Sequence, residues 1–315
     1  MFALGLIGDI GATNARFALV EQRGGFTRPR VLPTDEYASL ADAIAAYLAD
    51  EQVSVRPERA VLAVASPIVG DEVTLTNSPW SFSTRSLQSE LGLQKLHVVN
   101  DFVACALAIP HLVDSDRLQI GPGAAVAGAP IGILGPGTGL GVSALIQARE
   151  ERVAVESEGG HVTMAAENAR EEAVLRIMRR RFDHVSAERV LSGPGLVNLY
   201  NALCELSGVR AAAFTAAQIT DPRIDEEDVH AREAKAMFCE MLGGVAGNLA
   251  LTLGARGGIY IAGGIVPKLK EYICQSKFRA RFEGKGRLGT YLAGIPTDIV
   301  VHPWPALIGA SSLLA

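Results

Sequence analysis

Short apolar runs that end in small or polar residues recur along this chain of 315 residues. Residues 2–8, 61–65 and 96–99 are such runs, and their length and β-branched content predict buried strands. From residue 40 to residue 48, apolar side chains recur instead at the spacing of one helix face, after a capping Ser39. The alternation of strands and helices predicts an α/β architecture.

One pattern, a strand followed by a turn rich in small residues and a second strand, occurs twice. The first copy covers residues 2–20 and the second covers residues 131–146, about 125 positions later. We interpret the repeat as an internal duplication with one copy in each of two lobes. Backbone N–H groups and a hydroxyl in such turns can approach phosphate oxygens. A plain glycine-rich turn explains the first copy alone equally well, but two turns facing one cleft fit phosphoryl transfer.

The predicted strand at residues 96–99 ends in Asn100 and Asp101, directly before a predicted helix. Ligands of open α/β sheets bind beyond the carboxyl ends of the strands, so this pair is placed to face a substrate. The competing interpretation is that these side chains cap the helix, as Asn and Asp frequently do. Capping by Asp101 and a catalytic role for it are compatible.

Two glycine-rich segments in the second half of the chain supply further candidates. Glu158 and His161 are separated by two glycines, whose missing Cβ atoms allow the backbone to approach a small polar ligand. A lone histidine is more often structural, but the acidic neighbours favour a polar site here. Gly263 and Gly264 follow a predicted strand and leave room for the flat ring of a nucleoside; a tight strand-to-helix turn is the plain alternative.

Composition narrows the possible functions. Hydrophobic residues make up 49% of the chain, and its length favours two lobes with a cleft between them. The formal net charge is −5 without a basic tract, which argues against nucleic acid as a partner. No apolar run approaches the roughly 20 residues that cross a membrane, and no basic leader of a signal peptide is seen. The four widely spaced cysteines are expected to be buried free thiols in a reducing cytoplasm.

A loop-like segment after Pro110 suggests a connection between the lobes. We predict a small α/β domain at residues 1–110, a large α/β domain at residues 111–302, and a C-terminal helix at about residues 303–315 that packs back on the small one. Residues 226–253 predict one long helix. Trp80 is expected to pack at a domain edge rather than to line a ligand site.

Six motifs, taken in order, resemble those of bacterial glucokinases of the enterobacterial type over nearly the whole chain. They are residues 8–16, 100–102, 135–141, 158–161, 184–195 and 262–267. Each motif by itself is moderately specific for the family, and the shared order and spacing of all six are strong evidence for the resemblance. The resemblance implies the actin-like, hexokinase-type fold, in which two ribonuclease H-like lobes close on a sugar and ATP in the cleft between them.

The resemblance also implies roles for single residues. Asp101 corresponds to the catalytic base, and Asn100, Glu158, His161 and Glu188 correspond to residues that bind sugar hydroxyls. Asp9 would hold Mg²⁺ through its hydration water. The implied ATP-binding residues are Gly8, Asp9, Ile10, Gly11, Ala12, Thr13, Asn14, Gly137, Thr138, Gly139, Gly263 and Gly264.

The implied activity is phosphorylation of glucose to glucose 6-phosphate by a cytoplasmic homodimer, a step of glycolysis. Two departures are visible: Ala12 stands where the family commonly has glycine, and the zinc-binding cysteine cluster of the related ROK kinases is missing, so zinc is not expected. Mannose, fructose or an N-acetylhexosamine are alternative substrates. A sugar-sensing regulator is a further alternative, disfavoured because the first strand starts within the first ten residues.

Overall fold

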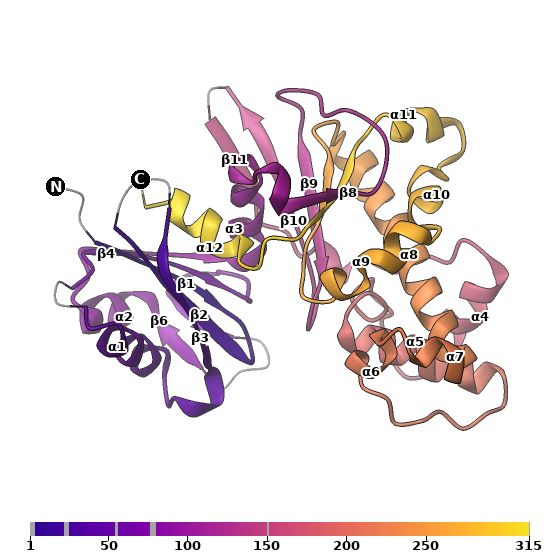
Figure 1. The fold of residues 1–315 in the computed structure, drawn as a ribbon, viewed down its shortest axis with the longest axis horizontal. Coiled ribbons are helices and arrows are strands. Elements are labelled where there is room, and N and C mark those ends of the chain that lie inside the picture. The colour runs from indigo at the N-terminus through magenta and orange to yellow at the C-terminus, as the bar shows by residue number, and fades with distance from the viewer. Residues whose placement is uncertain (1–3, 22–24, 54–55, 76–79, 150, 315) are drawn as a thin grey trace. The chain divides into compact units, whose positions relative to one another are not determined.

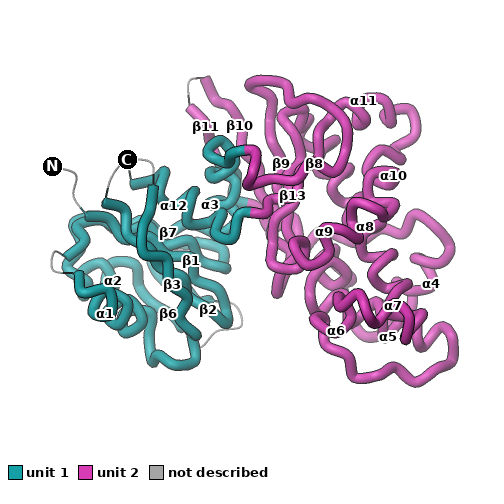
Figure 2. Tube along the Cα trace, in the orientation of Figure 1, with its two compact units in different colours: residues 1–113, 154–156, 302–315 teal, residues 114–153, 157–301 magenta. Residues whose placement is uncertain are grey.

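The computed structural model describes residues 4–21, 25–53, 56–75, 80–149 and 151–314. The chain divides into two compact units, drawn in two colours in Figure 2. Unit 1 comprises residues 1–113, 154–156 and 302–315, and unit 2 comprises residues 114–153 and 157–301. Each unit has its own hydrophobic core.

Unit 1 is built on a five-stranded sheet with the order β3-β2-β1-β4-β7 (Figure 1). The first three strands are antiparallel, whereas β4 and β7 run parallel to β1. The strands are β1 (Gly5–Ile10), β2 (Asn14–Val20), β3 (Thr27–Pro33), β4 (Arg59–Val64) and β7 (Lys95–Asn100). Ile10 of β1 is opposite Val64 of β4, which is opposite Asn100 of β7. The register therefore places the end of β7 at the same sheet edge as the turn after β1.

Helices and a small second sheet complete unit 1. The remaining elements are α1 (Leu40–Asp50), α2 (Thr84–Leu91), α3 (Asp101–Ala108), α12 (Pro305–Ser312), the 3₁₀ turns at Thr34–Glu36 and Ile109–His111, and the hairpin of β5 (Glu72–Thr74) and β6 (Ser81–Ser83). Ser39 caps α1 by accepting the Asp42 N–H at 3.1 Å, as its sequence predicts. The C-terminal α12 packs on α3, the helix that starts at Asp101 (Figure 1).

Unit 2 repeats the same sheet and adds one edge strand. Its order is β11-β10-β9-β12-β13-β8, with β9 and β10 antiparallel and with β12 and β13 parallel to β9. The strands are β8 (Arg117–Gln119), β9 (Ile131–Pro136), β10 (Leu140–Ala148), β11 (Glu151–Val155), β12 (Ile259–Ile261) and β13 (Thr297–Val300). A hairpin followed by parallel strands in both sheets confirms the predicted duplication.

Most of the helices belong to unit 2. They are α4 (Ala169–Met178), α5 (Gly193–Leu206), α6 (Ala216–Thr220), α7 (Ile224–Glu227), α8 (Val229–Leu253), α9 (Val266–Gln275), α10 (Phe278–Glu283) and α11 (Gly289–Ala293), with 3₁₀ turns at Asp114–Asp116, Gly159–His161 and Gly286–Leu288. The prediction of a single helix over residues 226–253 is wrong at its start, because α7 ends at Glu227 and α8 begins at Val229. Asp228 has extended backbone and caps a new helix, α8, by accepting the N–H groups of His230 and Ala231.

The 25-residue α8 is, within the described residues, the one helix long and apolar enough to span a membrane by length and composition. Its side chains are instead largely buried in the core of unit 2, against α5 and α10. Glycines make the close packing possible, since a Cβ at Gly243 would lie 2.2 Å from the Phe278 carbonyl oxygen. A buried core helix accounts for this apolar composition.

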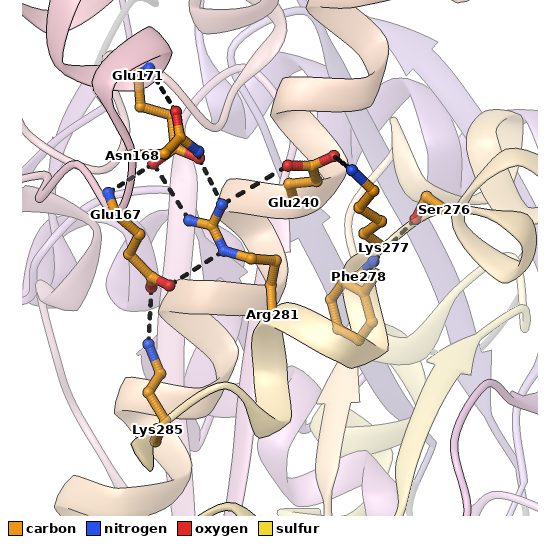
Figure 3. Close-up of polar contacts among 9 residues, drawn as sticks. All are labelled: Glu167, Asn168, Glu171, Glu240, Ser276, Lys277, Phe278, Arg281 and Lys285. Carbon is orange, nitrogen blue, oxygen red and sulfur yellow. Dashed lines mark hydrogen bonds and ion pairs between the residues drawn. The ribbon is translucent and has the colours of Figure 1, made fainter.

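An ion network around the buried Glu171 joins α4, α8 and α10 (Figure 3). Arg281 donates to both carboxylate oxygens of Glu171, at 2.5 and 3.2 Å, and contacts Glu167 at 3.1 Å and Glu240 at 3.6 Å. The Glu171 side chain is only 1% exposed, so its charge depends on these partners. Lys285 extends the network through Glu167 at 2.9 Å.

Two local predictions have different outcomes. Trp80 is buried, and its indole N–H donates to the Tyr37 carbonyl oxygen at 3.1 Å, which confirms a packing role. The expectation of four buried thiols is wrong for Cys274, which is exposed on α9, whereas Cys105, Cys204 and Cys239 are buried.

Candidate active site

The first turn, residues 11–13, joins β1 to β2 in unit 1. Gly11 N–H donates to the Asn14 carbonyl oxygen at 3.0 Å, while Thr13 is exposed at the tip. Within the part of the chain that the structure describes, the N–H groups of Ala12 and Thr13 meet no acceptor. Such amides are available to an anion without breaking an existing bond.

The flanking positions Gly8 and Ile10 support the turn from the core side. A Cβ at Gly8 would lie 2.8 Å from Leu62 Cδ2, and the Ile10 side chain is fully buried. Gly8 therefore allows close packing in the sheet, and these two residues can offer only backbone groups to a nucleotide. The methyl group of Ala12 leaves the turn intact, since the Ala12 carbonyl still accepts the Thr34 hydroxyl at 2.7 Å.

Asp9 lies on β1 directly before this turn. Its cross-strand partner Arg16 donates to Asp9 Oδ2 at 3.0 Å, and the Asp9 side chain is 18% exposed. Burial raises the pKa of Asp9, and the Arg16 guanidinium counteracts that rise. Asp9 therefore lies two residues before the turn, with Arg16 on one carboxylate oxygen and part of its side chain exposed.

Asn100 and Asp101 occupy the end of β7 and the start of α3, as predicted. Asn100 Oδ1 accepts the N–H groups of Phe102 at 2.9 Å and Val103 at 3.3 Å, so Asn100 is the N-cap. Of the two residues that the capping alternative named, Asp101 is not the N-cap: it is the first residue of the helix, and its carboxylate accepts the Phe102 N–H at 2.9 Å. Both side chains are half-buried, so a ligand can still reach them.

The register of the unit 1 sheet places Asp9 and Asp101 at the same edge, because Asp9 of β1 is opposite Ala63 of β4, which is opposite Val99 of β7. Burial raises the pKa of Cys105 well above its usual range, and the charges of both Asp101 and Asp9 raise it further. The charges of Asp9 and Asp101, which are far apart in the sequence, therefore both act on this thiol. The predicted base and the predicted cation-holding residue thus lie at one edge of the same sheet.

The second turn, residues 137–139, occupies the same place in the sheet of unit 2. Gly137 N–H donates to the Gly139 carbonyl oxygen at 2.8 Å, and Thr138 is exposed at the tip like Thr13. Among the described residues, the N–H groups of Thr138 and Gly139 meet no acceptor. The two hairpins therefore share the same position in their sheets, an exposed threonine at the tip, and two backbone N–H groups in the turn without an acceptor among the described residues.

The segment Glu158 to His161 packs beside this second hairpin. His161 Nε2 is 3.8 Å from Glu158 Oε2, and both side chains are more than half exposed, at 60% and 55%. A Cβ at Gly160 would lie 2.0 Å from the Leu140 carbonyl oxygen, so only glycine fits there. The Gly-Gly spacer thus allows the backbone to pack on β10 while a carboxylate and an imidazole face outward.

Glu188 joins this group through its main chain. Its N–H donates to the Gly160 carbonyl oxygen at 2.9 Å, which places it next to Glu158 and His161. Its carboxylate Oε2 accepts the Leu140 N–H at 3.0 Å, immediately after the second turn. The structure therefore gathers the three sugar-ligand candidates of unit 2 but gives Glu188 a contact that the sequence did not indicate.

Gly263 and Gly264 follow β12 and have different surroundings. Gly263 has a positive φ of 89°, and a Cβ there would lie 2.4 Å from the Pro136 carbonyl oxygen, so it forms the tight turn. Gly264 is exposed, and a Cβ there would meet no heavy atom within 4 Å. Gly263 thus makes the tight turn, and the exposed Gly264 stays a candidate for the nucleoside side.

Two anchors of these turns were missed in the sequence. Thr34, only 3% exposed, holds the first turn by donating its N–H to the Thr13 carbonyl at 3.0 Å and its hydroxyl to Ala12. Gly193, at the start of α5, donates its N–H to the Gly137 carbonyl at 2.8 Å. Both anchors turn carbonyls of the loops inward. No local sequence signal marks them, because each bond joins segments far apart in the chain.

The duplicated sheets, each with its turn after the first strand, define the class: the chain has the α/β actin-like ATPase fold of sugar kinases. A solved glucokinase from an Antarctic psychrotroph matches with a TM-score of 0.89, at 36% identity over 100% of this chain and 99% of that one. A ROK family glucokinase from Streptomyces griseus, at 17% identity and covering 98% of each chain, has the same fold with a TM-score of 0.66.

Sequence comparison is more specific. The chain is 52% identical over 310 residues to a glucokinase of Paramagnetospirillum magneticum, covering 98% of this chain and 97% of the relative. The glucokinase family model matches residues 6–315. The chain therefore belongs to the glucokinase family, and the resemblance inferred from its motifs is confirmed.

Proposed function

We propose that this chain transfers the γ-phosphoryl group of ATP to the 6-hydroxyl of glucose. Membership in the glucokinase family over nearly the whole chain supports this activity. The observation that carries it is the pair of hairpin turns, one in each unit, with free amides at equivalent positions. Two such turns suit a polyphosphate, whose transfer depends mainly on positioning and on charge neutralisation.

Asp101 serves as the general base in this proposal. Its carboxylate accepts the proton of the 6-hydroxyl while the hydroxyl oxygen bonds to the γ-phosphorus and ADP leaves. The start of α3 is a suitable place, because the helix N-terminus favours a negative side chain and the cap by Asn100 fixes the backbone. Positioned bases of this kind contribute about 10²–10⁴-fold to the rate.

The sugar ring is held by Asn100, Glu158, His161 and Glu188. Glu158 and His161 present an acceptor and a donor–acceptor side by side on an exposed surface of unit 2, which matches vicinal hydroxyls. The amide of Asn100 contributes mainly through Nδ2, since its Oδ1 is used by the helix cap. In this structure Nδ2 donates to the Ser66 carbonyl oxygen at 3.4 Å. This bond is long and therefore weak, so a sugar hydroxyl can replace it.

The nucleotide is bound by the two turns and by the glycine pair. Residues 11–13 and 137–139 donate to phosphate oxygens, and Gly264 leaves space for the adenosine. Asp9 fits Mg²⁺ that arrives with ATP and keeps its waters, since it offers one accessible carboxylate beside the first turn. When bound, the ion neutralises charge on the phosphates.

The Asp101→Asn variant tests the base. We expect kcat to fall at least 100-fold at saturating glucose and ATP, with KM for both substrates little changed. The matched control is Asp50→Asn, which removes a carboxylate from the surface end of α1, where it pairs with Arg30. A decrease in kcat of less than about 100-fold in the Asp101→Asn variant contradicts the assigned role.

The preferred sugar, the assembly and the location of the enzyme are part of the proposal. We expect glucose to be used better than mannose, fructose or N-acetylglucosamine in a panel with coupled detection of ADP. We also expect a homodimer in light scattering and enzyme in the cytoplasmic fraction of cells. A higher kcat/KM for another hexose would reassign the substrate while leaving the phosphate turns in their roles.

A further inference from the structure

Glu188 uses three separate polar groups to bond to three different parts of unit 2. Its N–H donates to the Gly160 carbonyl at 2.9 Å, within the Glu158–His161 segment. Its carbonyl accepts the Ser192 hydroxyl at 2.8 Å, and Ser192 is the N-cap of α5. Its carboxylate accepts the Leu140 N–H at 3.0 Å. One residue thus connects the sugar-facing segment, a helix start and the second hairpin.

The carboxylate lies directly against the second turn. A Cβ on Gly139 would be 2.4 Å from Glu188 Oε2, so the side chain occupies the space that a larger residue would need. Leu140 is the first residue of β10 and lies opposite Pro136, whose carbonyl oxygen accepts the Ile265 N–H at 3.3 Å. The Glu188 carboxylate supplies an acceptor for the Leu140 N–H at the end of the turn.

Other contacts hold the same turn from the α5 side. Gly193, one residue after Ser192, donates its N–H to the Gly137 carbonyl at 2.8 Å. The turn is thus fixed at residue 137 by α5 and next to residue 139 by Glu188, with the free amides of Thr138 and Gly139 between these two points. Moving either anchor would change the direction of those amides.

We propose that Glu188 is a positioning residue for the second phosphate turn and that it couples sugar affinity to nucleotide affinity within this unit. The inference rests on the proposed function for the identity of the two ligands. Glu188 is half-buried, so its carboxylate is reachable by a sugar hydroxyl while Oε2 holds the turn. A sugar that orders this side chain orders the turn as well, and the coupling must be reciprocal.

Binding of Mg·ADP without sugar separates this role from simple sugar contact. Glu188→Asp shortens the side chain so that it no longer reaches the Leu140 N–H, whereas Glu188→Gln keeps an acceptor oxygen at the right length. By calorimetry we expect the Kd for Mg·ADP to rise about tenfold in the Asp variant, the effect of losing one hydrogen bond. The Gln variant should stay within about threefold of wild type. Wild-type Kd in the Asp variant overturns the proposal.

Glucose supplies the second readout. In the wild type, saturating glucose should tighten Mg·ADP binding, and saturating Mg·ADP should tighten glucose binding by the same factor. In the Glu188→Asp variant this factor should fall towards one. An unchanged factor in that variant shows that the coupling does not pass through Glu188.

A double-mutant cycle with Gly139 separates the direct contact with Glu188 from a general loss of folded structure. Gly139→Ala places a methyl group against Oε2 and should weaken Mg·ADP binding in the wild-type background. In the Glu188→Ala background the carboxylate is gone, so the same change should cost clearly less. Equal losses in both backgrounds contradict the contact. Thermal unfolding of each variant shows whether it is folded.

Glu158→Gln is the matched control. Glu158 belongs to the same exposed sugar-facing group but makes no hydrogen bond or ion pair with residues 137–140 among the described residues. We expect a raised KM for glucose and an unchanged Kd for Mg·ADP without sugar.

The failure of the proposed function can be told apart from the failure of the role of Glu188. If the wild type forms no ADP with glucose, the proposed function fails, while the Kd values for Mg·ADP still decide the role of Glu188. A wild type that binds no nucleotide overturns both.

Discussion

Adjacent residues at the end of β7 have different physical tasks. Asn100 caps α3 with its side-chain oxygen Oδ1, a contribution of about 1 kcal/mol to stability. Asp101 follows as the first helical residue and keeps a half-buried carboxylate at the sheet edge. Replacing Asn100 would therefore affect both helix stability and sugar binding, whereas replacing Asp101 tests the chemistry more directly.

At the residue scale, the pKa of Asp9 is raised by burial and lowered by the neighbouring Arg16. The Arg16→Gln variant should therefore have a still higher Asp9 pKa. Asp9 then takes up a proton at a higher pH, and the acid-side decrease of kcat/KM for MgATP should move to higher pH. Measured pH profiles test this. Arg30→Gln, which breaks surface pairs with Asp50 and Glu51, should leave the profile in place.

The packing of α12 on α3 is decided by one small residue at the element scale. A Cβ at Gly309 would lie 1.8 Å from the Ala104 carbonyl oxygen, in the backbone of the helix that carries Asp101. Gly309→Ala should gain about 1 kcal/mol in helix propensity but lose more through overpacking, for a net destabilisation of about 2 kcal/mol. Urea unfolding measures this. Ser311→Ala on the same helix is the control, and equal stability of both variants contradicts the expected clash.

The network of Figure 3 stabilises three helices of unit 2 only while it is complete. Arg281→Met leaves Glu171 buried without its main cationic partner, and we expect a loss of about 3 kcal/mol in the free energy of unfolding. Arg180→Ala removes an exposed pair with Glu205 and should cost less than about 1 kcal/mol. Chemical denaturation that gives similar losses for the two variants would show that the buried pair contributes no more than the surface pair.

Ligand binding should stabilise the whole molecule. Glucose that binds the folded chain and not the unfolded chain adds about 2.7 kcal/mol at a concentration of 100 times its Kd. We expect the Tm to rise with glucose and to rise less with sorbitol at the same concentration. An equal rise with both compounds points to a general solvent effect and contradicts a glucose site.

The sequence by itself determined features whose signals are local. Apolar periods and small-residue turns predicted the α/β architecture, the two hairpins and the duplication, because strand and turn preferences act over a few residues. The position of Asn100 and Asp101 at a strand end followed in the same way. The roles of single residues still came from the resemblance of ordered motifs to a family.

Only the tertiary structure decided which segments meet. Thr34 on the first turn, Gly193 and Glu188 on the second, and Gly263 against Pro136 are contacts between segments that are distant in the chain. Such contacts depend on how strands and helices pack, which no local pattern encodes. The sequence thus placed the phosphate turns and the candidate base, and the packing of each unit determined how the turns are held.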